Sequence, residues 1–402
     1  MAYPYERPPP PEKEERDSRL KAANRDLRGI CARAKLNHFM VNEKLLLRHV
    51  LLVGSSGSGK TNHAFNLIKQ AASFAEPCSC IVLDVKKEYS RLGKILPHVQ
   101  VFSIGGEPRF RFNPLIPPPG VDDQHHDRAL TEVFTRAYGL AEPSRRIMLD
   151  ALSELRRKSK ESPTLRELEL AVAGFEPGSP KEQGSKRSLE SRLHIINTGP
   201  LGESLNYEEP LGIGLLDNGV SVFEIGEVDS LRDQRFVSEL LLMYIWQHDR
   251  YDVDEDPENF RRLVVVEEAH RYLSEERPPE QRGDRTLLEL AIAEARRYGW
   301  GFVIIDQMPM LLSRYVWDNV GTVITHRLSN IDSYRVVRRA IGEIPMGQNM
   351  DDERLAPLIF RLPENLAMYR KYVGEDSMEL PSGFVEVPFV GRNAPSSENP
   401  TL

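Results

Sequence analysis

Residues 54–61 place glycines, small hydroxyl side chains and a lysine in the spacing G-x-x-x-x-G-K-[ST]. An apolar run at 50–53 predicts a buried strand before this loop, and residues 62–68 predict a helix after it. Such a loop surrounds a polyphosphate with backbone N–H groups, and the helix dipole adds to the attraction. Lys60 can then reach the β- and γ-phosphates, while the Thr61 hydroxyl can bind Mg²⁺. The predicted nucleotide-binding residues here are Gly54, Ser56, Gly57, Ser58, Gly59, Lys60, Thr61 and Asn62.

Two carboxylates follow another apolar run. Residues 263–266 are Leu and Val, and Glu267 and Glu268 come directly after them. This pattern is typical of a Walker B strand, whose first acidic residue holds Mg²⁺ through water and whose second polarises the attacking water. We therefore predict Glu267 as the metal-binding residue and Glu268 as the catalytic base. Glu267 stands where aspartate is usual, which gives a longer arm.

The apolar runs also predict the fold. Strands are expected at 50–53, 80–84, 99–104, 220–225, 263–266, 301–305 and 322–325. Helical patterns lie between them, which indicates an α/β fold with a mostly parallel, doubly wound sheet. Ligands of such sheets bind beyond the carboxyl ends of the strands. Gln307, which follows one of these ends, is therefore predicted to sense the γ-phosphate or to orient water.

The chain divides into five predicted segments. They are a flexible or docking N-terminal arm at 1–27, the first part of the core at 28–124, a helical insertion at 125–205, the second part of the core at 206–345 and a C-terminal extension at 346–402. The arm is Pro-rich and then densely charged, and the insertion is charged and interrupted by a Gly/Pro loop.

Composition and charge limit the classes of protein to which the chain can belong. The chain has 402 residues, 40% of them hydrophobic, with a net charge of −7. No apolar run approaches the ~20 residues that span a membrane, and the start has no signal-peptide pattern. The three cysteines form no metal-ligand set, so we expect reduced thiols in a cytoplasmic protein without membrane contact. The acidic balance argues against an evenly basic surface, although a ring can carry a basic lining inside an acidic shell.

Residues 125–127, His-His-Asp, resemble part of a metal site. Adjacent side chains of a helix or strand point apart, however, so we interpret them as a polar helix start. The sequence itself contains no set of residues typical of a nuclease active site.

Seven motifs in order resemble the HerA branch of the HerA/FtsK hexameric DNA-translocase ATPases. They lie at 48–50, 81–89, 112–115, 267–270, 294–299, 306–309 and 319–328, so the resemblance covers about residues 40–345. The chain departs from the family pattern at Lys86 and Lys87, where glycine is frequent, and at Met308, where arginine is common. Only about 40 residues precede the core, too few for the family's usual N-terminal β-barrel.

The resemblance implies a RecA-like P-loop NTPase core that forms a homo-oligomeric ring, a hexamer, with ATP and Mg²⁺ between subunits and DNA in the central pore. It also implies that Arg296, or alternatively Arg297, is supplied to the neighbouring subunit's nucleotide. Arg48 is expected to contact the nucleotide within its own subunit, and Asp84 to support Mg²⁺ or the water.

Three functions remain open at this point. The first is an ATP-driven DNA-translocating motor, of helicase type, that works with a separately encoded nuclease or other effector. The second is a regulatory or scaffolding NTPase ring that controls an effector in antiviral defence, and the third is a small-molecule kinase. For the motor, the candidate DNA-phosphate contacts are Lys86, Lys87, Arg232 and Arg235.

Overall fold

The computed structural model describes residues 39–74, 78–107, 110–158, 162–209, 212–228, 230–252, 259–274, 285–341, 352–371 and 382–390. The predicted arm and Cys31 lie outside these ranges. Within them, no helix is long and apolar enough to cross a membrane. Cys78 and Cys80 are both buried and free.

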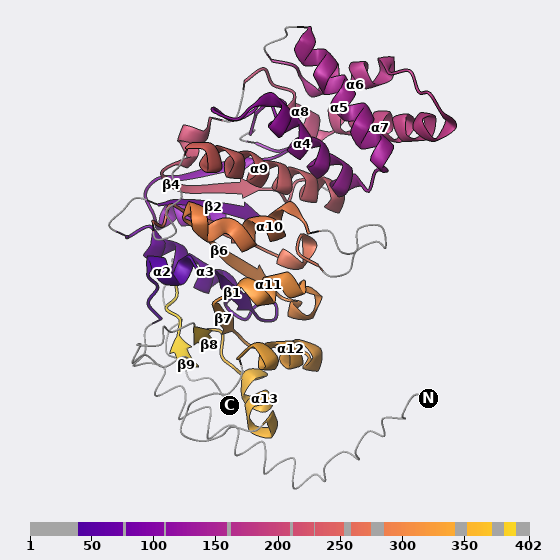
Figure 1. The fold of residues 1–402 in the computed structure, drawn as a ribbon. Coiled ribbons are helices and arrows are strands. Elements are labelled where there is room, and N and C mark those ends of the chain that lie inside the picture. The colour runs from indigo at the N-terminus through magenta and orange to yellow at the C-terminus, as the bar shows by residue number, and fades with distance from the viewer. Residues whose placement is uncertain are drawn as a thin grey trace, which may run out of the picture.

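The described residues form a nine-stranded sheet (Figure 1). Across the sheet the strands are β3 (Val99–Ser103), β4 (Gly219–Glu224), β2 (Ser79–Asp84), β5 (Arg262–Val266), β6 (Trp300–Asp306), β1 (Val50–Val53), β7 (Thr322–Thr325), β8 (Leu366–Lys371) and β9 (Ser382–Glu386). All neighbours from β3 to β7 are parallel, whereas β8 and β9 are antiparallel. The α/β fold with a mostly parallel sheet is therefore confirmed. The sequence did not predict β8 and β9, which join the sheet although they lie in the predicted extension at 346–402.

Helices connect and cover the strands. They are α2 (Glu43–Leu46), α3 (Lys60–Ala71), α4 (Asp123–Tyr138), α5 (Glu142–Arg157), α6 (Leu165–Gly174), α7 (Pro180–Thr198), α8 (Pro200–Leu205), α9 (Leu231–Asp252), α10 (Leu287–Glu294), α11 (Arg314–Asn319), α12 (Ile331–Ile341) and α13 (Asp352–Ile359). Short 3₁₀ turns occur at η1 (Tyr89–Lys94), η2 (Ile213–Leu216), η3 (Ala269–Arg271), η5 (Ala295–Tyr298) and η6 (Pro309–Leu311).

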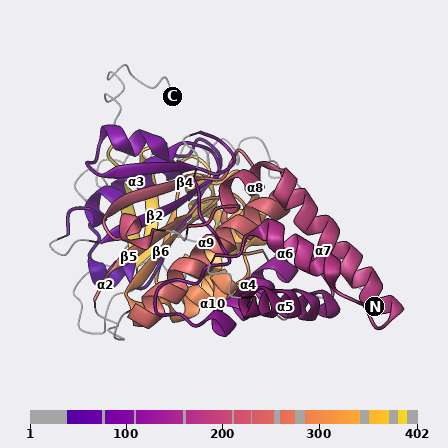
Figure 2. The ribbon, with the colours of Figure 1, turned by 90° about the horizontal axis from the view of Figure 1, so that it is seen from above.

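Strands β1, β2, β5, β6 and β7 are buried at every position, and since successive side chains point in opposite directions, both of their faces are covered. In β1, Val50 and Leu52 belong to the core that includes α3, whereas Leu51 and Val53 belong to the core that includes α9 and α10. Figure 2 shows α3 on one side of the strands and α9 and α10 on the other. This explains why the strands have continuous apolar runs rather than alternating patterns.

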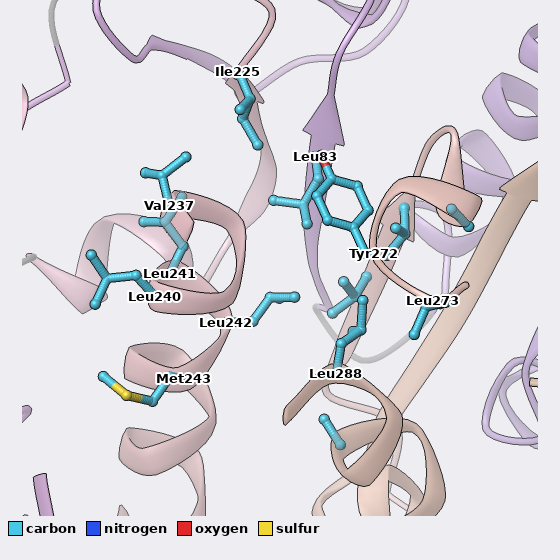
Figure 3. Close-up of a cluster of buried hydrophobic side chains, with 14 of the residues drawn as sticks. Leu83, Ile225, Val237, Leu240, Leu241, Leu242, Met243, Tyr272, Leu273 and Leu288 are labelled. Carbon is cyan, nitrogen blue, oxygen red and sulfur yellow. The ribbon is translucent and has the colours of Figure 1, made fainter. Parts of the chain in front are cut away.

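Packing under α9 and α10 fixes the ends of the strands that carry the candidate site. Figure 3 shows Leu83 of β2 close to Tyr272, which follows η3, and Leu242 of α9 between that pair and the rest of its helix. Leu83, Leu242 and Leu288 are at most 1% exposed. Residues just before Asp84 and just after Glu268 are thus held in one close-packed core, which limits the movement of both.

Residues 123–205 form five helices, α4 to α8, between β3 and β4 in the sequence. Asp122 caps the start of α4 through its side chain. The ring of Phe134 in α4 lies 5.3 Å from that of Phe236 in α9, which ties this region to the sheet layer. Figure 1 shows α5, α6 and α7 beyond α4, away from the sheet.

The residues 125–127 lie in the first turn of α4, as the helix-start interpretation requires. The His126 ring nitrogens lie 2.8 Å from the Gln247 side-chain oxygen and 2.8 Å from the Pro114 carbonyl, and Arg156 binds Asp127 at 2.6 Å. Among the described residues, no group of three or more His, Cys, Asp or Glu side chains is placed to hold a metal ion.

Candidate functional site

The loop between β1 and α3 has the backbone shape of a phosphate cradle. Gly57 and Gly59 have φ values of 64° and 98°, a region that side chains strongly disfavour. A Cβ atom at Gly59 would also collide with the carbonyl oxygen of Glu364. The second glycine is therefore required both by the turn and by the segment packed over it.

Lys60 lies over this loop, with its side chain directed back at the backbone. Its Nζ donates to the carbonyl oxygens of Gly54 at 2.8 Å and Ser55 at 2.9 Å. Burial and, to a smaller extent, the charge of Lys86 lower its pKa to about 8, although Glu268 and Glu267 oppose the shift. The ammonium group is thus hydrogen-bonded to loop carbonyls, which it can exchange for phosphate oxygens.

The two residues after Lys60 face different partners. The Thr61 hydroxyl donates to Glu88 at 2.9 Å. The Asn62 side chain donates to the Pro388 carbonyl at 2.9 Å and accepts from the Val390 N–H at 2.8 Å. Its side-chain amide thus binds the C-terminal segment, but Asn62 also lines the P-loop cavity, and its contact with the nucleotide stays a prediction.

Glu267 and Glu268 follow β5 and are each only 2% exposed. Burial raises the pKa of Glu267 to about 8; Lys86 opposes this effect, and Asp84 and Glu88 add to it. Glu268 has a φ of 50° and a ψ of 49°, a left-handed conformation that is unusual outside glycine and asparagine. Such strain is typical of functional sites, where the surrounding packing enforces it.

Lys86 connects the carboxylates with the P-loop cavity. Its ammonium group pairs with Glu268 and lies 3.8 Å from Glu267. Asp84, fully buried at the end of β2, accepts 2.9 Å hydrogen bonds from the N–H groups of Lys86 and Tyr89 and so shapes the turn that presents Lys86. The structure therefore gives Asp84 a contact with this turn, whereas the sequence predicted a role at Mg²⁺ or water.

The other basic residues predicted to contact DNA are also placed. Lys87 has a φ of 58° and pairs with Glu227. Arg235 donates to the carbonyl oxygen of Arg271, and Arg232 is exposed near the start of α9. DNA contact by these residues stays a prediction.

The end of β6 contributes another buried carboxylate to this edge of the sheet. Asp306 is fully buried and accepts a hydrogen bond of 2.5 Å from the His270 N–H, and the His270 Nδ1 lies 3.0 Å from the same carboxylate. This contact joins β6 to the turn after Glu268. Gln307 follows at the strand tip and is half-buried.

The predicted arginines lie at the opposite edge of the sheet. Arg296 and Arg297 are exposed in η5, directly before β6 begins, and Arg48 directly precedes His49 at the start of β1. Since β1 and β6 are parallel, both positions are at the amino edge, whereas the P-loop follows the carboxyl end of β1. The structure does not bring Arg48 or Arg296 to the P-loop of their own chain.

Sequence reasoning missed several residues around the loop. Arg327, after β7, accepts hydrogen bonds at its carbonyl from the Ser55 N–H at 2.8 Å and the Ser55 hydroxyl at 3.0 Å, and its side chain lies 3.4 Å from the Gly57 carbonyl. The motif at 319–328 contains this arginine, so a signal was present. The motif at 81–89 likewise contains Glu88, whereas Glu364 carried no such signal, because only tertiary packing brings it to the loop.

A single cavity of about 610 Å³ runs along the P-loop. Its lining includes Lys60, Thr61 and Lys86. The Glu267 Oε2 atom is buried without a hydrogen-bond partner among the described residues. A hydroxyl and a carboxylate oxygen are the hard donors that Mg²⁺ prefers, so Thr61 and Glu267 fit a magnesium ion chemically.

The family model described as "Helicase HerA, central domain" matches residues 36–243, more than half of the chain. The chain belongs to this family. The match covers the P-loop, Asp84 and the helical region of this HerA central-domain protein, and it ends before the strand that carries Glu267 and Glu268. No curated protein matches the chain.

Solved structures show the same fold. The chain is similar to VirB4 of Thermoanaerobacter pseudethanolicus, with 15% identity and a TM-score of 0.63. The match covers 85% of the present chain and 90% of the VirB4 chain. It is also similar to the plasmid coupling protein TrwB in complex with ADP and Mg²⁺, with 11% identity, a TM-score of 0.64, and coverage of 91% and 94%. At such identities the likeness shows the fold alone, and it confirms the P-loop NTPase architecture.

Proposed function

We propose that this protein is an ATP-hydrolysing ring motor that translocates DNA and works with a separately encoded nuclease or other effector. The observation that carries the proposal is the convergence of the P-loop and the two carboxylates at one edge of the sheet. Lys86 pairs with Glu268 and lines the P-loop cavity, so the two halves meet. Membership of the HerA helicase central-domain family and the TrwB complex with ADP and Mg²⁺ support it.

Binding begins at the loop and the start of α3. Backbone N–H groups of the loop and the helix N-terminus attract the phosphates, and Lys60 leaves its carbonyl partners for the β- and γ-oxygens. Thr61 and Glu267 would hold Mg²⁺, which would neutralise phosphate charge when bound. The Thr61 oxygen would bind the metal through a lone pair, so the hydroxyl can keep its hydrogen bond to Glu88.

Hydrolysis requires a base beside the γ-phosphate. Glu268 takes a proton from the attacking water, and Gln307 at the adjacent strand tip orients that water. The salt bridge places the Lys86 ammonium group beside Glu268 and brings a second positive charge toward the γ-phosphate. The site thus suits water activation rather than transfer to a small molecule.

The active site is completed by a neighbouring subunit. Arg296 is exposed at the amino edge of the sheet, away from its own P-loop, as an arginine delivered in trans must be. Six such interfaces in a homo-hexamer leave a central pore for DNA. This arrangement makes hydrolysis dependent on assembly.

Proton release provides a pH-dependent test of the metal site. With a pKa of about 8, Glu267 is about nine-tenths protonated at pH 7. Mg²⁺ needs the carboxylate, so binding of Mg²⁺–ATP should release about one proton per site at pH 7 and fewer as the pH rises above 8. Calorimetry in buffers of different ionisation enthalpy measures this number. Glu267→Gln should abolish the release and the exposed Glu294→Gln should not; equal release from both variants would contradict the assignment.

DNA dependence separates the motor from the scaffold. A motor should hydrolyse ATP faster with DNA, and the stimulation should grow with DNA length until the track exceeds the distance travelled per binding event. Steady-state ATPase rates with duplexes of increasing length, at fixed salt, measure this. ATP-dependent assembly with turnover indifferent to DNA would instead indicate a scaffolding ring that controls an effector in antiviral defence.

A further inference from the structure

The C-terminal segment Pro388–Val390 is fastened to the helix that begins at the P-loop. Asn62 donates to the Pro388 carbonyl and accepts from the Val390 N–H, so its amide binds the backbone of the segment at both groups, as the backbone of a paired strand does. Asn66, one turn further along α3, donates to the same Pro388 carbonyl at 2.8 Å. An amide side chain can do both because it carries a donor and an acceptor.

These contacts place the segment over the cavity. The lining of the 610 Å³ space combines the P-loop with four apolar side chains, Phe65, Ile95, Phe389 and Val390, and also includes Arg91 and Lys94. Tyr89 packs edge-on against the Phe65 ring, with centroids 5.2 Å apart. The volume falls in the range of small-molecule sites, and the cavity offers apolar contacts in addition to its phosphate-binding loop.

We propose that the apolar side chains of this lining bind the nucleobase of the triphosphate and that Phe389 and Val390 form one wall of the base site. This inference rests on the proposed ATP site, because the P-loop fixes the phosphates and leaves the base to extend along the same cavity. A flat aromatic heterocycle suits a wall of one aromatic and one branched aliphatic side chain. Asn62 and Asn66 are positioning residues, since their side-chain amides bind the backbone of the segment that carries the wall.

The experiment compares ATP with inorganic tripolyphosphate, which has the phosphates but no base. Equilibrium dissociation constants for both, with Mg²⁺, are measured on the full chain. Phe389→Ala should weaken ATP binding by about tenfold and leave tripolyphosphate binding within about twofold of wild type, since only base contacts are lost. Asn66→Ala should shift ATP in the same direction by a smaller factor. Phe175→Ala, a half-buried phenylalanine in the helical region, is the matched control and should change neither.

Lys60→Ala distinguishes this inference from the proposed function, because it should weaken both ligands. If Lys60→Ala changes neither constant, the ATP site itself is wrong. If Lys60→Ala weakens both ligands while Phe389→Ala weakens both equally or neither, the ATP site stands and the base wall is overturned. Photolabelling of the wild-type chain with 8-azido-ATP gives a second measurement: the label should fall on the peptide that contains 388–390 or on the one that contains Phe65, and labelling confined to other peptides overturns the assignment.

Discussion

Glu268→Gln is expected to lower the rate of ATP hydrolysis by roughly 10²–10⁴-fold while ATP binding stays close to wild type. Glutamine keeps the size of the side chain but cannot accept a proton from water. Because Glu268 is buried and ion-paired with Lys86, its replacement removes the charge without opening the site to solvent. Single-turnover hydrolysis and equilibrium ATP binding on the same preparation measure the two effects separately, and the variant should accumulate bound ATP.

Glu267→Gln is the matched comparison, since it changes the adjacent and equally buried carboxylate. Its main effect should be weaker binding of Mg²⁺–ATP, because glutamine supplies no negative charge to the metal. A variant of Glu267 that retains ATP without hydrolysis, next to a Glu268 variant that hydrolyses normally, would show that the two roles are exchanged.

Arg296→Ala should reduce hydrolysis by on the order of 10³-fold or more when every subunit carries it, again with normal ATP binding. The lost guanidinium no longer neutralises charge on the transferring phosphoryl group. Arg297→Ala is the control, because it removes the next exposed arginine of the same 3₁₀ turn. If Arg297→Ala causes the larger loss, the trans arginine is Arg297.

Mixing subunits tests whether the site is shared. Rings that contain both Arg296→Ala and Lys60→Ala subunits should recover part of the activity, because some interfaces combine an intact P-loop with an intact arginine. Two lesions that act within one subunit cannot complement in this way. If hydrolysis requires several consecutive intact sites, rescue will appear only at some mixing ratios, so rates are measured across a range of ratios. No rescue at any ratio, together with a monomeric mass in ATP, would rule out the shared-site arrangement.

Local signals were sufficient to predict the parallel strands and the P-loop. Strands buried on both faces are uniformly apolar, and the glycine spacing reflects backbone angles that few other residues adopt. The sequence of β8, Leu-Ala-Met-Tyr-Arg-Lys, has no such run, and β9 is equally mixed. Strand β8 is placed by pairing with β7, a contact between distant parts of the chain, and β9 by pairing with β8, so no local pattern predicts their position.

The site residues likewise divide into those that local motifs predict and those that only tertiary packing places. The P-loop and the paired carboxylates were visible as motifs, whereas the partners of Lys86 and Asn62 depend on how separate loops pack. Lys86 looked like a surface cation until the turn fixed by Asp84 directed it to Glu268. The family resemblance implied that Arg48 contacts the nucleotide, but a strand advances about 3.3 Å per residue, so β1 carries Arg48 and the P-loop to opposite edges of the sheet.

The parts of the nucleotide pocket are made at very different times during synthesis of the chain. The P-loop leaves the ribosome early, whereas Glu364, which covers Gly59, and the segment at 388–390 are translated last among the described residues. At ~5–20 residues per second, a separation of about 300 residues corresponds to about 15–60 s. Throughout that interval a nascent chain has a phosphate loop without its cover. Firm retention of ATP should therefore begin only after residues 388–390 have been made, so that shorter nascent chains do not bind the nucleotide tightly.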